Sequence, residues 1–597
     1  MQRDGVISPK QAGSLCGLFV ERVRRSPDKV AYRYFHQNDW RELTWRQMRG
    51  EVARWQAGLA RLELQRGDRV AVMMRNCPYW LMFDQAALSL GLVVVPLYTV
   101  DRPDNIAYIV NDADVKVLLF ENAEQWQALR TVRDQIDGIR RFISIDNLGN
   151  VDEPRLRPMS EFLPPAAQMQ DPLPCETNEL STIIYTSGTT GRPKGVMLSH
   201  ANILTNAHAC LDTFEVHSDD LFLSFLPLSH AFERTLGYYL PIMTGSTVAF
   251  ARSVSQLSKD LETIRPTILI SVPRIYERFY AAIRQKLDEG LVIRRKLFQL
   301  AVDTGWARFE HAQGRAPWKA SFLLWPLLQK LVAQKILDRL GGRLRVAVSG
   351  GAALSPEISR VFVGLGLPVL QGYGLTEASP VVAGNRLDSN FPGSVGLPIS
   401  GIEVRLDEQD VLMVKGPNVM MGYWNKPEAT REMIDDDGWL NTGDVARISG
   451  TGHIYITGRV KEIIVMSNGE KVPPSDMELA ILRDPLFDQV MIFGEAHPYL
   501  VALAVLNPEG WENFAREIGI RHDMPEALTD SRVEAKFLKR IALNLRGFPG
   551  YAKVNRVLLL RESWSIENGL LTPTLKLKRE VVTARYMAQI KRLYDGH

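Results

Sequence analysis

Cysteine is scarce in this chain, and the patterns that usually accompany it are lacking. Four cysteines occur among 597 residues: Cys16, Cys77, Cys175 and Cys210. They are widely scattered and none belongs to a CxxC pair, so the sequence predicts neither a disulfide framework nor a zinc site. Such cysteine usage is typical of a reducing compartment, and we expect a cytoplasmic protein.

Long apolar runs and clusters of one charge are also lacking. The first residues contain no apolar h-region, which argues against a cleavable secretory signal. The most apolar stretch, Trp80 to Val100, is interrupted by Asp84, Gln85 and Pro96, and therefore predicts a buried helix followed by a buried strand, not a membrane span. The net charge is +3 and no basic run occurs, which argues against a nucleic-acid partner.

The order of apolar runs predicts a multidomain α/β protein. From about residue 15 to residue 450, short apolar runs alternate with helical patterns, as expected for α/β layering. Predicted strands include 70–74, 115–120, 268–272 and 344–349, with a helix near 79–90 as the crossover between the first two. At about 395–455 short strands with turn signals predict a β-rich subdomain. We place a domain boundary between residues 460 and 461, with a smaller α+β domain at 461–597.

The segment from Tyr185 to Gly195 is dense in groups that bind phosphate. It supplies hydroxyls from Ser187, Thr189 and Thr190, backbone freedom at Gly188, Gly191 and Gly195, and the charge of Lys194. The apolar run at 180–185 indicates that this loop leaves a strand. It is not a Walker A loop, because Gly195, and not serine or threonine, follows the lysine.

Three later glycine-containing clusters suit the other parts of ATP. The small residues of Ser349–Ala353 form a flat wall for a planar ring. The run Gln371–Glu377 offers an aromatic face, a hydroxyl and a carboxylate suited to Mg²⁺. The run Asp437–Asp444 ends in a carboxylate that can accept two ribose hydroxyls. Each cluster alone is weak, since glycine turns followed by an acid are often structural.

Together and in this order, the clusters resemble the adenylate-forming superfamily of acyl-CoA synthetases, luciferases and peptide-synthetase adenylation domains. The resemblance covers nearly the whole chain. Within the superfamily, Phe225–Arg234, the long segment Ile275–Gly341 and Leu571–Arg579 look most like long-chain fatty acyl-CoA synthetases. This resemblance implies a large N-terminal adenylation domain and a small mobile C-terminal domain, with ATP bound between them.

The resemblance also implies roles for individual residues. Those for the triphosphate are Thr186, Ser187, Gly188, Thr189, Thr190, Gly191 and Lys194. Those around adenine and the α-phosphate are Gly350, Gly351, Ala352, Gln371, Gly372, Tyr373, Gly374 and Thr376. Asp444 and Arg459 are the implied ribose ligands, and Lys461 occupies the hinge. Glu377, together with Thr186, would hold Mg²⁺. His230 would line the acyl pocket near the carboxylate. Glu377 as the cap of a turn and His230 as an ordinary core histidine are the alternatives.

Lys576 matches the lysine that the family brings to the carboxylate and the α-phosphate. Many family members have glycine immediately before this lysine, whereas Leu575 stands here, and Lys578 is a second candidate. The run Thr572–Thr574 sets the register in favour of Lys576. The implied reaction forms an acyl-adenylate from a fatty acid and ATP, and then transfers the acyl group to CoA. Because the adenylate supplies the leaving group, no protein nucleophile is needed.

Several alternatives stay open at this point. The enzyme could adenylate another acid or load a separate carrier protein, or the chain could be a silent nucleotide- or lipid-binding homologue. The basic and aromatic residues between Leu291 and Leu340 suit peripheral contact with the inner face of a membrane, or simple packing on the catalytic domain. Chain-length preference is not marked by any motif. Oligomeric state is open, with a homodimer as one option.

Overall fold

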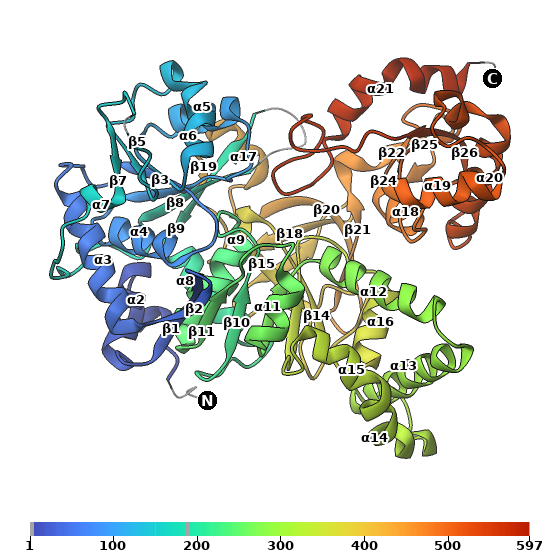
Figure 1. Cartoon of the computed structure of the whole chain (residues 1–597), viewed down its shortest axis with the longest axis horizontal. Coiled ribbons are helices and arrows are strands. Elements are labelled where there is room, and N and C mark those ends of the chain that lie inside the picture. The colour runs from blue at the N-terminus through green and yellow to red at the C-terminus, as the bar shows by residue number, and fades with distance from the viewer. Residues whose placement is uncertain (1–4, 150, 187–191, 596–597) are drawn as a thin grey trace.

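The computed structural model describes residues 5–149, 151–186 and 192–595. Two sheets dominate the N-terminal part of the chain (Figure 1). In spatial order, the first sheet contains β16 (Leu397–Pro398), β15 (Val381–Gly384), β14 (Val369–Gly374), β13 (Val346–Ser349), β12 (Ile268–Ser271), β10 (Leu221–Ser224), β11 (Thr247–Phe250), β1 (Val30–His36) and β2 (Asp39–Thr44). The second contains β19 (Gly422–Tyr423), β9 (Lys194–Ser199), β8 (Leu180–Thr186), β4 (Val93–Pro96), β3 (Arg69–Met73), β5 (Val115–Phe120), β6 (Arg141–Ser144) and β7 (Leu156–Pro158).

Alternation along the strands gives each sheet two buried faces. Val70 and Val72 of β3 point into the core between the two sheets, whereas Ala71 and Met73 point into a second core under α5 and α6. Helical elements between the sheets are α2 (Leu15–Arg25), α3 (Trp45–Ala60), α4 (Pro78–Ser89), α8 (His200–Cys210), α9 (Ala231–Glu233), η2 (Arg234–Tyr239) and α10 (Leu240–Thr244). The short helix α1 (Pro9–Ala12) precedes them, and α7 (Met159–Phe162) follows β7. The outer face of the second sheet is covered by α5 (Pro103–Asp112) and α6 (Ala123–Arg130).

The outer face of the first sheet is covered by α11 (Leu257–Ile264), α12 (Pro273–Asp288) and α16 (Pro356–Gly364). The layers are therefore α/β/α/β/α, and the predicted α/β architecture is confirmed. A helical projection extends from this face, seen below the C-terminal part in Figure 1. It contains α13 (Val292–Ala312), η3 (Ala320–Leu324), α14 (Trp325–Leu328), η4 (Gln329–Ala333), α15 (Gln334–Leu337) and η5 (Asp338–Leu340).

One connection differs from the prediction. The helix expected near 79–90 is α4, but it leads from β3 to β4 and not to the strand at 115–120. Both β4 and β5 pair with β3 in parallel, because the buried run 93–96 adds a strand and α5 then completes a second crossover. The most apolar stretch is thus a buried helix and a buried strand, as predicted, and no helix within the described ranges is long and apolar enough to cross a membrane.

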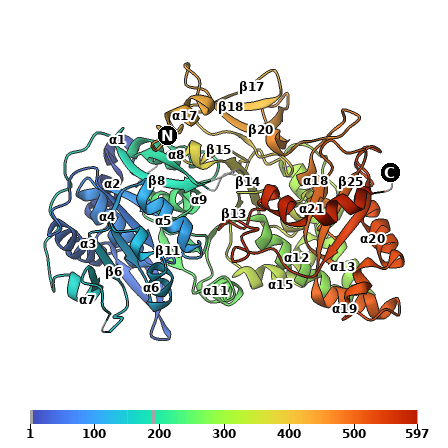
Figure 2. The same ribbon diagram turned by 90° about the horizontal axis from the view of Figure 1, so that it is seen from above.

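A smaller antiparallel sheet follows the two large ones. Its strands are β17 (Glu403–Leu406), β18 (Val411–Lys415), β20 (Leu440–Ile448) and β21 (Ile454–Arg459), with α17 (Pro427–Met433) between β19 and β20. Figure 2 shows this sheet as a separate lobe beside the large sheets. It overlaps the range of about 395–455 predicted to be β-rich, and β21 continues past that range to Arg459.

The C-terminal residues surround their own sheet and cores. Its strands are β24 (Phe487–Phe493), β25 (Leu500–Leu506) and β26 (Val554–Leu560), and a hairpin of β22 (Ile464–Val465) and β23 (Lys471–Val472) precedes them. Alternate residues of β25 face α18 (Pro474–Ile481), α19 (Pro508–Glu517) and α20 (Ser531–Asn544) on one side and α21 (Arg579–Tyr594) on the other. The domain boundary between residues 460 and 461 stays a prediction.

Candidate active site

The predicted phosphate loop connects two antiparallel strands. Thr186 ends β8 and pairs with Lys194, which begins β9. A Walker A loop leads into a helix, whereas this loop leads into a strand, in agreement with its departure from the Walker pattern. The predicted phosphate ligands Ser187, Gly188, Thr189, Thr190 and Gly191 lie outside the described residues.

Tyr423 connects this hairpin to the predicted metal ligand. Its strand, β19, pairs with β9, and the Lys194 ammonium lies 5.0 Å from the centre of the Tyr423 ring. The Tyr423 hydroxyl donates a 2.8 Å hydrogen bond to Oε1 of Glu377. Because Tyr423 stands in no recognised motif, sequence reasoning missed it. Its hydroxyl orients the Glu377 carboxylate, and its ring lies beside the Lys194 ammonium.

The adenine-wall and Tyr-Gly clusters meet at one edge of the first sheet. Gly350 and Gly351 follow β13, while Gln371 to Gly374 end β14, and the two strands are parallel with Ser349 beside Gln371. In open α/β sheets, ligands bind outside the carboxyl ends of such strands. A Cβ atom on Gly350 would lie 2.8 Å from the Phe232 ring, and one on Gly374 would lie 1.9 Å from the Pro380 carbonyl oxygen. Both turns therefore exclude side chains. Ala352 is exposed and Gly372 is half-buried.

Gln371 has a buried donor to spare. Its Oε1 accepts from the backbone N–H of Leu354 at 3.1 Å, but its Nε2 has no protein partner among the described atoms. A buried amide without a partner costs stability, so this donor is suited to a polar ligand. Thr376, five residues later in the sequence, begins η6 (Thr376–Ala378) and is also buried.

Tyr373, Asp444 and Arg459 form one hydrogen-bonded group. The Tyr373 hydroxyl donates to Oδ2 of Asp444 at 2.5 Å, and Arg459 Nε donates to Oδ1 at 2.7 Å. Burial and the neighbouring Asp444 carboxylate raise the pKa of Tyr373 well above its usual value, so the phenol stays protonated and donates. This group joins β14 to the small antiparallel sheet, because Asp444 lies on β20 and Arg459 on β21.

His230 is a neutral side chain at the N-cap of α9. Its Nδ1 accepts from the backbone N–H of Phe232 at 3.2 Å, so the neutral ring carries its proton on Nε2. Burial, and secondly the Lys576 ammonium, lower the pKa of His230 to about 4. The residue therefore contributes an uncharged donor near Lys576 at neutral pH, which suits an oxygen atom of a carboxylic acid.

Lys576 comes from the C-terminal domain to the same group of charges. The Lys576 side chain is accessible to solvent, yet desolvation by surrounding protein lowers its pKa, and Arg459 lowers it further. The carboxylates of Asp444, Glu462 and Glu377 act in the opposite direction. Figure 1 shows the loop before α21 reaching from the C-terminal domain toward the N-terminal sheets.

The register of this loop distinguishes Lys576 from Lys578. A tight turn closes when Thr572 N–H donates to the Lys576 carbonyl at 2.8 Å, and Leu575 within it has φ 61°. Glycine adopts this left-handed conformation most easily, which explains physically why glycine suits the position before the lysine. Lys578 instead interacts with Asp101, outside the ATP cluster.

A buried ion pair holds the segment that follows His230. Arg234 Nη2 donates to Oδ1 of Asp84 at 2.5 Å, and its Nη1 donates to the Thr182 hydroxyl at 2.7 Å. The Tyr239 hydroxyl donates to the other oxygen of Asp84 at 2.8 Å. Since Thr182 lies on β8, the pair fixes η2 relative to the strand that leads into the phosphate loop. Its role could not be seen from the sequence, where Asp84 only interrupts an apolar run.

Glu377 is suited to a hard cation, but only with oxygen atoms from the substrate. Among residues 5–149, 151–186 and 192–595, no group of three or more histidine, cysteine, aspartate or glutamate side chains could hold a metal. Magnesium is commonly held by one or two carboxylates together with phosphate oxygens and water. The single carboxylate of Glu377, held by Tyr423, fits that arrangement.

Lys461, the predicted hinge residue, lies in η7 (Val460–Glu462), and its side chain is outside what the structure describes.

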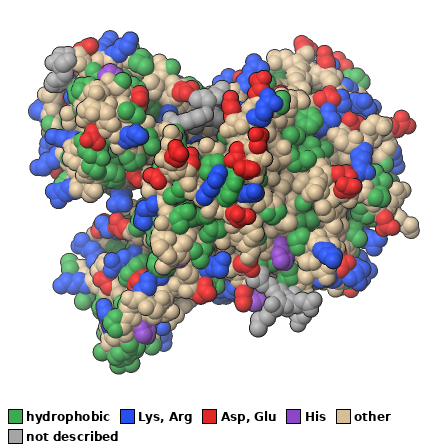
Figure 3. Space-filling view, turned by 180° about the vertical axis from the view of Figure 1, so that it is seen from behind, with side chains coloured by type: hydrophobic (Ala, Val, Ile, Leu, Met, Phe, Trp, Pro, Cys, Tyr) green, Lys and Arg blue, Asp and Glu red, His purple; other side chains and the backbone are tan. Residues whose placement is uncertain are grey.

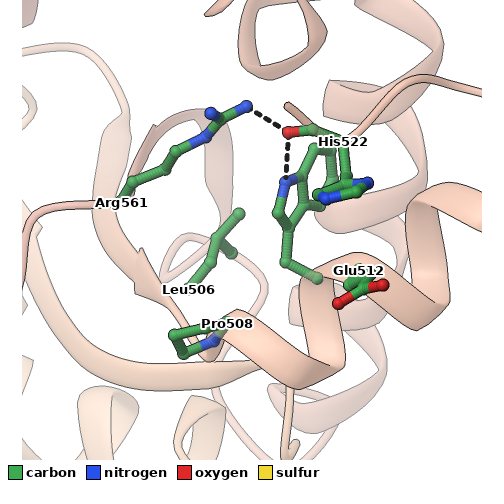
Figure 4. Close-up of a pocket in the computed structure, with 6 residues that line it drawn as sticks. Leu506, Pro508, Glu512, His522 and Arg561 are labelled. Atoms are coloured by element: carbon green, nitrogen blue, oxygen red, sulfur yellow. Dashed lines mark hydrogen bonds between the residues drawn. The ribbon is translucent and has the colours of Figure 1, made fainter. Parts of the chain in front are cut away.

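A pocket elsewhere in the molecule does not include these residues. It is lined by Leu506, Pro508, Trp511, Glu512, His522 and Arg561, all of the C-terminal domain (Figure 4). Trp511 Nε1 donates to the His522 carbonyl at 3.1 Å, and Arg561 donates to the same oxygen. Both side chains thus hold the His522 backbone, and no predicted site residue in the described part of the chain lines this pocket.

Two family matches cover most of the chain. Residues 19–424 match the family described as AMP-binding enzyme, and residues 461–597 match the AMP-binding enzyme C-terminal domain. The chain belongs to the AMP-binding enzyme family. The resemblance inferred from the sequence motifs is therefore confirmed.

Relatives and solved structures agree over nearly the full length. The chain is 32% identical to the peroxisomal long chain acyl-CoA synthetase 6 of Arabidopsis thaliana, over 90% of this chain and 79% of that protein. It is 29% identical to the long-chain-fatty-acid–CoA ligase FadD15 of Mycobacterium bovis, over 98% and 97% of the two chains. The chain shares its fold with the adenylation domain of a carboxylic acid reductase from Segniliparus rugosus, which was solved with AMP and a carboxylic acid. The TM-score is 0.76 and the identity 23%, and the match covers 99% of this chain and 95% of that domain.

Proposed function

We propose that the protein is an AMP-forming long-chain fatty acid–CoA ligase. It converts a fatty acid and ATP to acyl-adenylate and pyrophosphate, and then converts the adenylate and CoA to acyl-CoA and AMP. The observation that carries the proposal is the convergence of Lys576 with His230, Glu377 and Asp444. The relatives named as long-chain acyl-CoA synthetases and ligases support the choice of acid.

The geometry supplies what the first half-reaction requires. A carboxylate must approach the α-phosphate of ATP although both are anionic, and the Lys576 ammonium offsets that repulsion. Neutral His230 offers its Nε2–H to the acid, while the hairpin with Thr186 and Lys194 holds the departing pyrophosphate. Mg²⁺, held by Glu377 and phosphate oxygens, would neutralise charge on the phosphates. The carboxylate oxygen then bonds to the α-phosphorus as the bond to pyrophosphate breaks.

The second half-reaction needs less from these groups. The thiolate of CoA attacks the acyl carbon of the mixed anhydride, and AMP leaves with the electron pair of the broken C–O bond. Because AMP is already a good leaving group, the protein has to position the thiol and retain the nucleotide. We infer that Tyr373, Asp444 and Arg459 hold the adenosine during both steps.

The test measures pyrophosphate release from ATP across carboxylic acids of increasing length, with and without CoA. We expect release to require a long-chain acid and to be accompanied by acyl-CoA when CoA is present. Release with long-chain acids but no thioester would favour loading of a separate carrier protein. Release without dependence on any fatty acid, or no release at all, would contradict the proposed ligase.

We also propose that the helical projection makes peripheral contact with an anionic membrane surface. The residues from 318 to 335 expose apolar side chains just before η3 and on η3, α14 and η4, namely Trp318, Leu323, Leu324, Leu327 and Leu331. Lys319, Lys330 and Lys335 are exposed beside them. Apolar residues rimmed by lysine suit insertion into the headgroup region of anionic lipid. Figure 3 shows hydrophobic and basic side chains together at the tip of this projection.

Vesicle flotation tests the membrane proposal. We expect the protein to float with vesicles containing phosphatidylglycerol at low salt, and Leu323→Ser with Leu327→Ser to reduce the bound fraction at least several-fold. Leu543→Ser, at an exposed leucine of α20, is the matched control and should bind as the unmodified protein does. Absence of co-migration at low salt, or equal loss in the control, would overturn this assignment and leave the ligase proposal untouched.

A further inference from the structure

Two of the scattered cysteines meet in the fold. Cys16 lies in the first turn of α2 and is buried, whereas Cys175 is only partly buried in the segment 163–179 that leads into β8. The Cys175 side chain interacts with those of Cys16, His200 and Ser14. None of these four residues belongs to the ATP cluster.

The surroundings hold both cysteines in place. Ser14, the N-cap of α2, has its hydroxyl 3.2 Å from the Cys16 sulfur and accepts from Gly17 N–H at 3.0 Å. The backbone N–H of Leu15 donates to Nδ1 of His200 at 3.2 Å, which fastens the first turn of α2 to the start of α8. On the other side, Ala201 N–H donates to the Thr177 carbonyl at 2.6 Å, which fastens the segment of Cys175 to the same helix.

The two thiols are chemically unequal. Contact with Cys16, and next with His200, lowers the pKa of Cys175, which therefore has the greater thiolate character. Because Nδ1 of His200 accepts from Leu15, the neutral ring has its proton on Nε2 and can donate it to a thiolate. Cys175 and burial raise the pKa of Cys16, which stays a thiol. A partly exposed thiolate beside a buried thiol is the arrangement of an attacking and a resolving cysteine.

We propose that Cys175 and Cys16 form a reversible disulfide after Cys175 reacts with a hydroperoxide. The Cys175 thiolate attacks one oxygen of hydrogen peroxide; an S–O bond forms, the O–O bond breaks, and the departing hydroxide takes a proton to become water. The Cys16 sulfur then attacks the sulfenic sulfur of Cys175. An S–S bond forms, the S–O bond breaks, and the hydroxide leaves as water with the proton of Cys16.

The position of this disulfide gives it a structural consequence. It fastens the segment 163–179 covalently to α2 immediately before β8, and β8 ends at Thr186, where the phosphate loop begins. The hydrogen bonds of Leu15 and Ala201 hold both segments against the start of α8 in the reduced protein. The inference does not depend on which acid the enzyme activates.

Thiol mapping on the full-length protein tests the proposal. After treatment with hydrogen peroxide and blocking of free thiols, digestion without reductant should yield a linked peptide containing Cys16 and Cys175, which dithiothreitol separates. Cys77 and Cys210 are internal controls, because burial raises the pKa of both thiols. In the untreated protein at neutral pH, we expect iodoacetamide to alkylate Cys175 at least about tenfold faster than either control, as its thiolate character requires.

Two variants separate the steps. Cys16→Ser should leave oxidised Cys175 as a sulfenic acid that dimedone traps, whereas Cys175→Ser should prevent both trapping and linkage; Cys77→Ser should change neither. All three should retain ATP-dependent pyrophosphate release when reduced. Alkylation of Cys175 no faster than of Cys77, or oxidation of Cys175 in the unmodified protein without any linked peptide, would overturn the proposal.

Discussion

The hydroxyl of Tyr423 donates a 2.8 Å hydrogen bond to Glu377, so the proposed metal ligand is oriented by a residue from an edge strand of the second sheet. The same ring lies 5.0 Å from the Lys194 ammonium. One aromatic side chain thus positions both the carboxylate for Mg²⁺ and a cation for the phosphates. Tyr423 itself belongs neither to the motif that contains Glu377 nor to the motif that contains Lys194.

Tyr423→Phe should raise the Mg²⁺ concentration needed for half-maximal pyrophosphate release by about tenfold, because hydrogen bonds to a metal ligand commonly tune affinity by that order. The phenylalanine ring keeps its place beside Lys194, so the affinity for ATP at saturating Mg²⁺ should change little. Tyr423→Ala removes both contacts and should affect both quantities. An unchanged Mg²⁺ dependence in the phenylalanine variant would contradict the role of the hydroxyl.

Lys576→Ala should abolish acyl-adenylate formation while sparing thioester formation from preformed adenylate. The reason is that the ammonium offsets anionic repulsion in the first half-reaction only. Lys578→Ala is the matched control, two positions away and beside Asp101, and should retain both half-reactions. Comparable losses in both halves for Lys576→Ala would refute its assignment.

Leu575 should tolerate glycine but not a β-branched residue. Its φ of 61° is accessible to glycine without strain, whereas valine there is a backbone outlier. Leu575→Gly should keep the adenylation rate within about twofold, and Leu575→Val should destabilise the turn by about 1–2 kcal/mol and slow adenylation. Half-reaction rates measured for both variants check this; equal rates would show that the turn conformation does not position Lys576.

Breaking the buried pair of Asp84 and Arg234 should destabilise the N-terminal domain strongly. Removal of one partner leaves an uncompensated buried charge, which costs about 3–5 kcal/mol. Arg234→Met should therefore lower the Tm clearly, and adding Asp84→Leu should recover part of the loss. Calorimetry of the single and double variants measures the effect. A single variant as stable as the unmodified protein would mean that the pair does not hold η2.

Stability should fall with acid partly through His230. Its folded pKa is about 4, below the usual value near 6.5, so between these values the unfolded chain binds a proton that the folded protein does not. Its contribution is complete above pH 6.5 and is lost as the pH falls toward 4, up to about 2 kcal/mol at pH 5. His230→Gln should reduce the difference in Tm between pH 7 and pH 5; an identical difference would contradict the depressed pKa.

Local patterns in the sequence determined the α/β layering, the buried helix and strand of Trp80–Val100, and the family. These features depend on residues close together in the chain, where hydrophobic period and motif spacing are visible. The crossover from β3 was predicted wrongly, because pairing order in a sheet depends on contacts between distant strands. The Lys576 motif was marked by its sequence, as were Asp444 and Glu377 near it, whereas Glu462 was not.

Only the tertiary structure decided which distant groups face one another. Tyr423 beside Glu377, Asp84 beside Arg234, and Cys16 beside Cys175 are pairs that no spacing predicts, because each joins elements that meet through folding of separate chain segments. The sequence supplied the chemical types and the site residues that the resemblance implies. Burial and packing decided their protonation, their orientation and, for the two cysteines, the partner that makes one of them reactive.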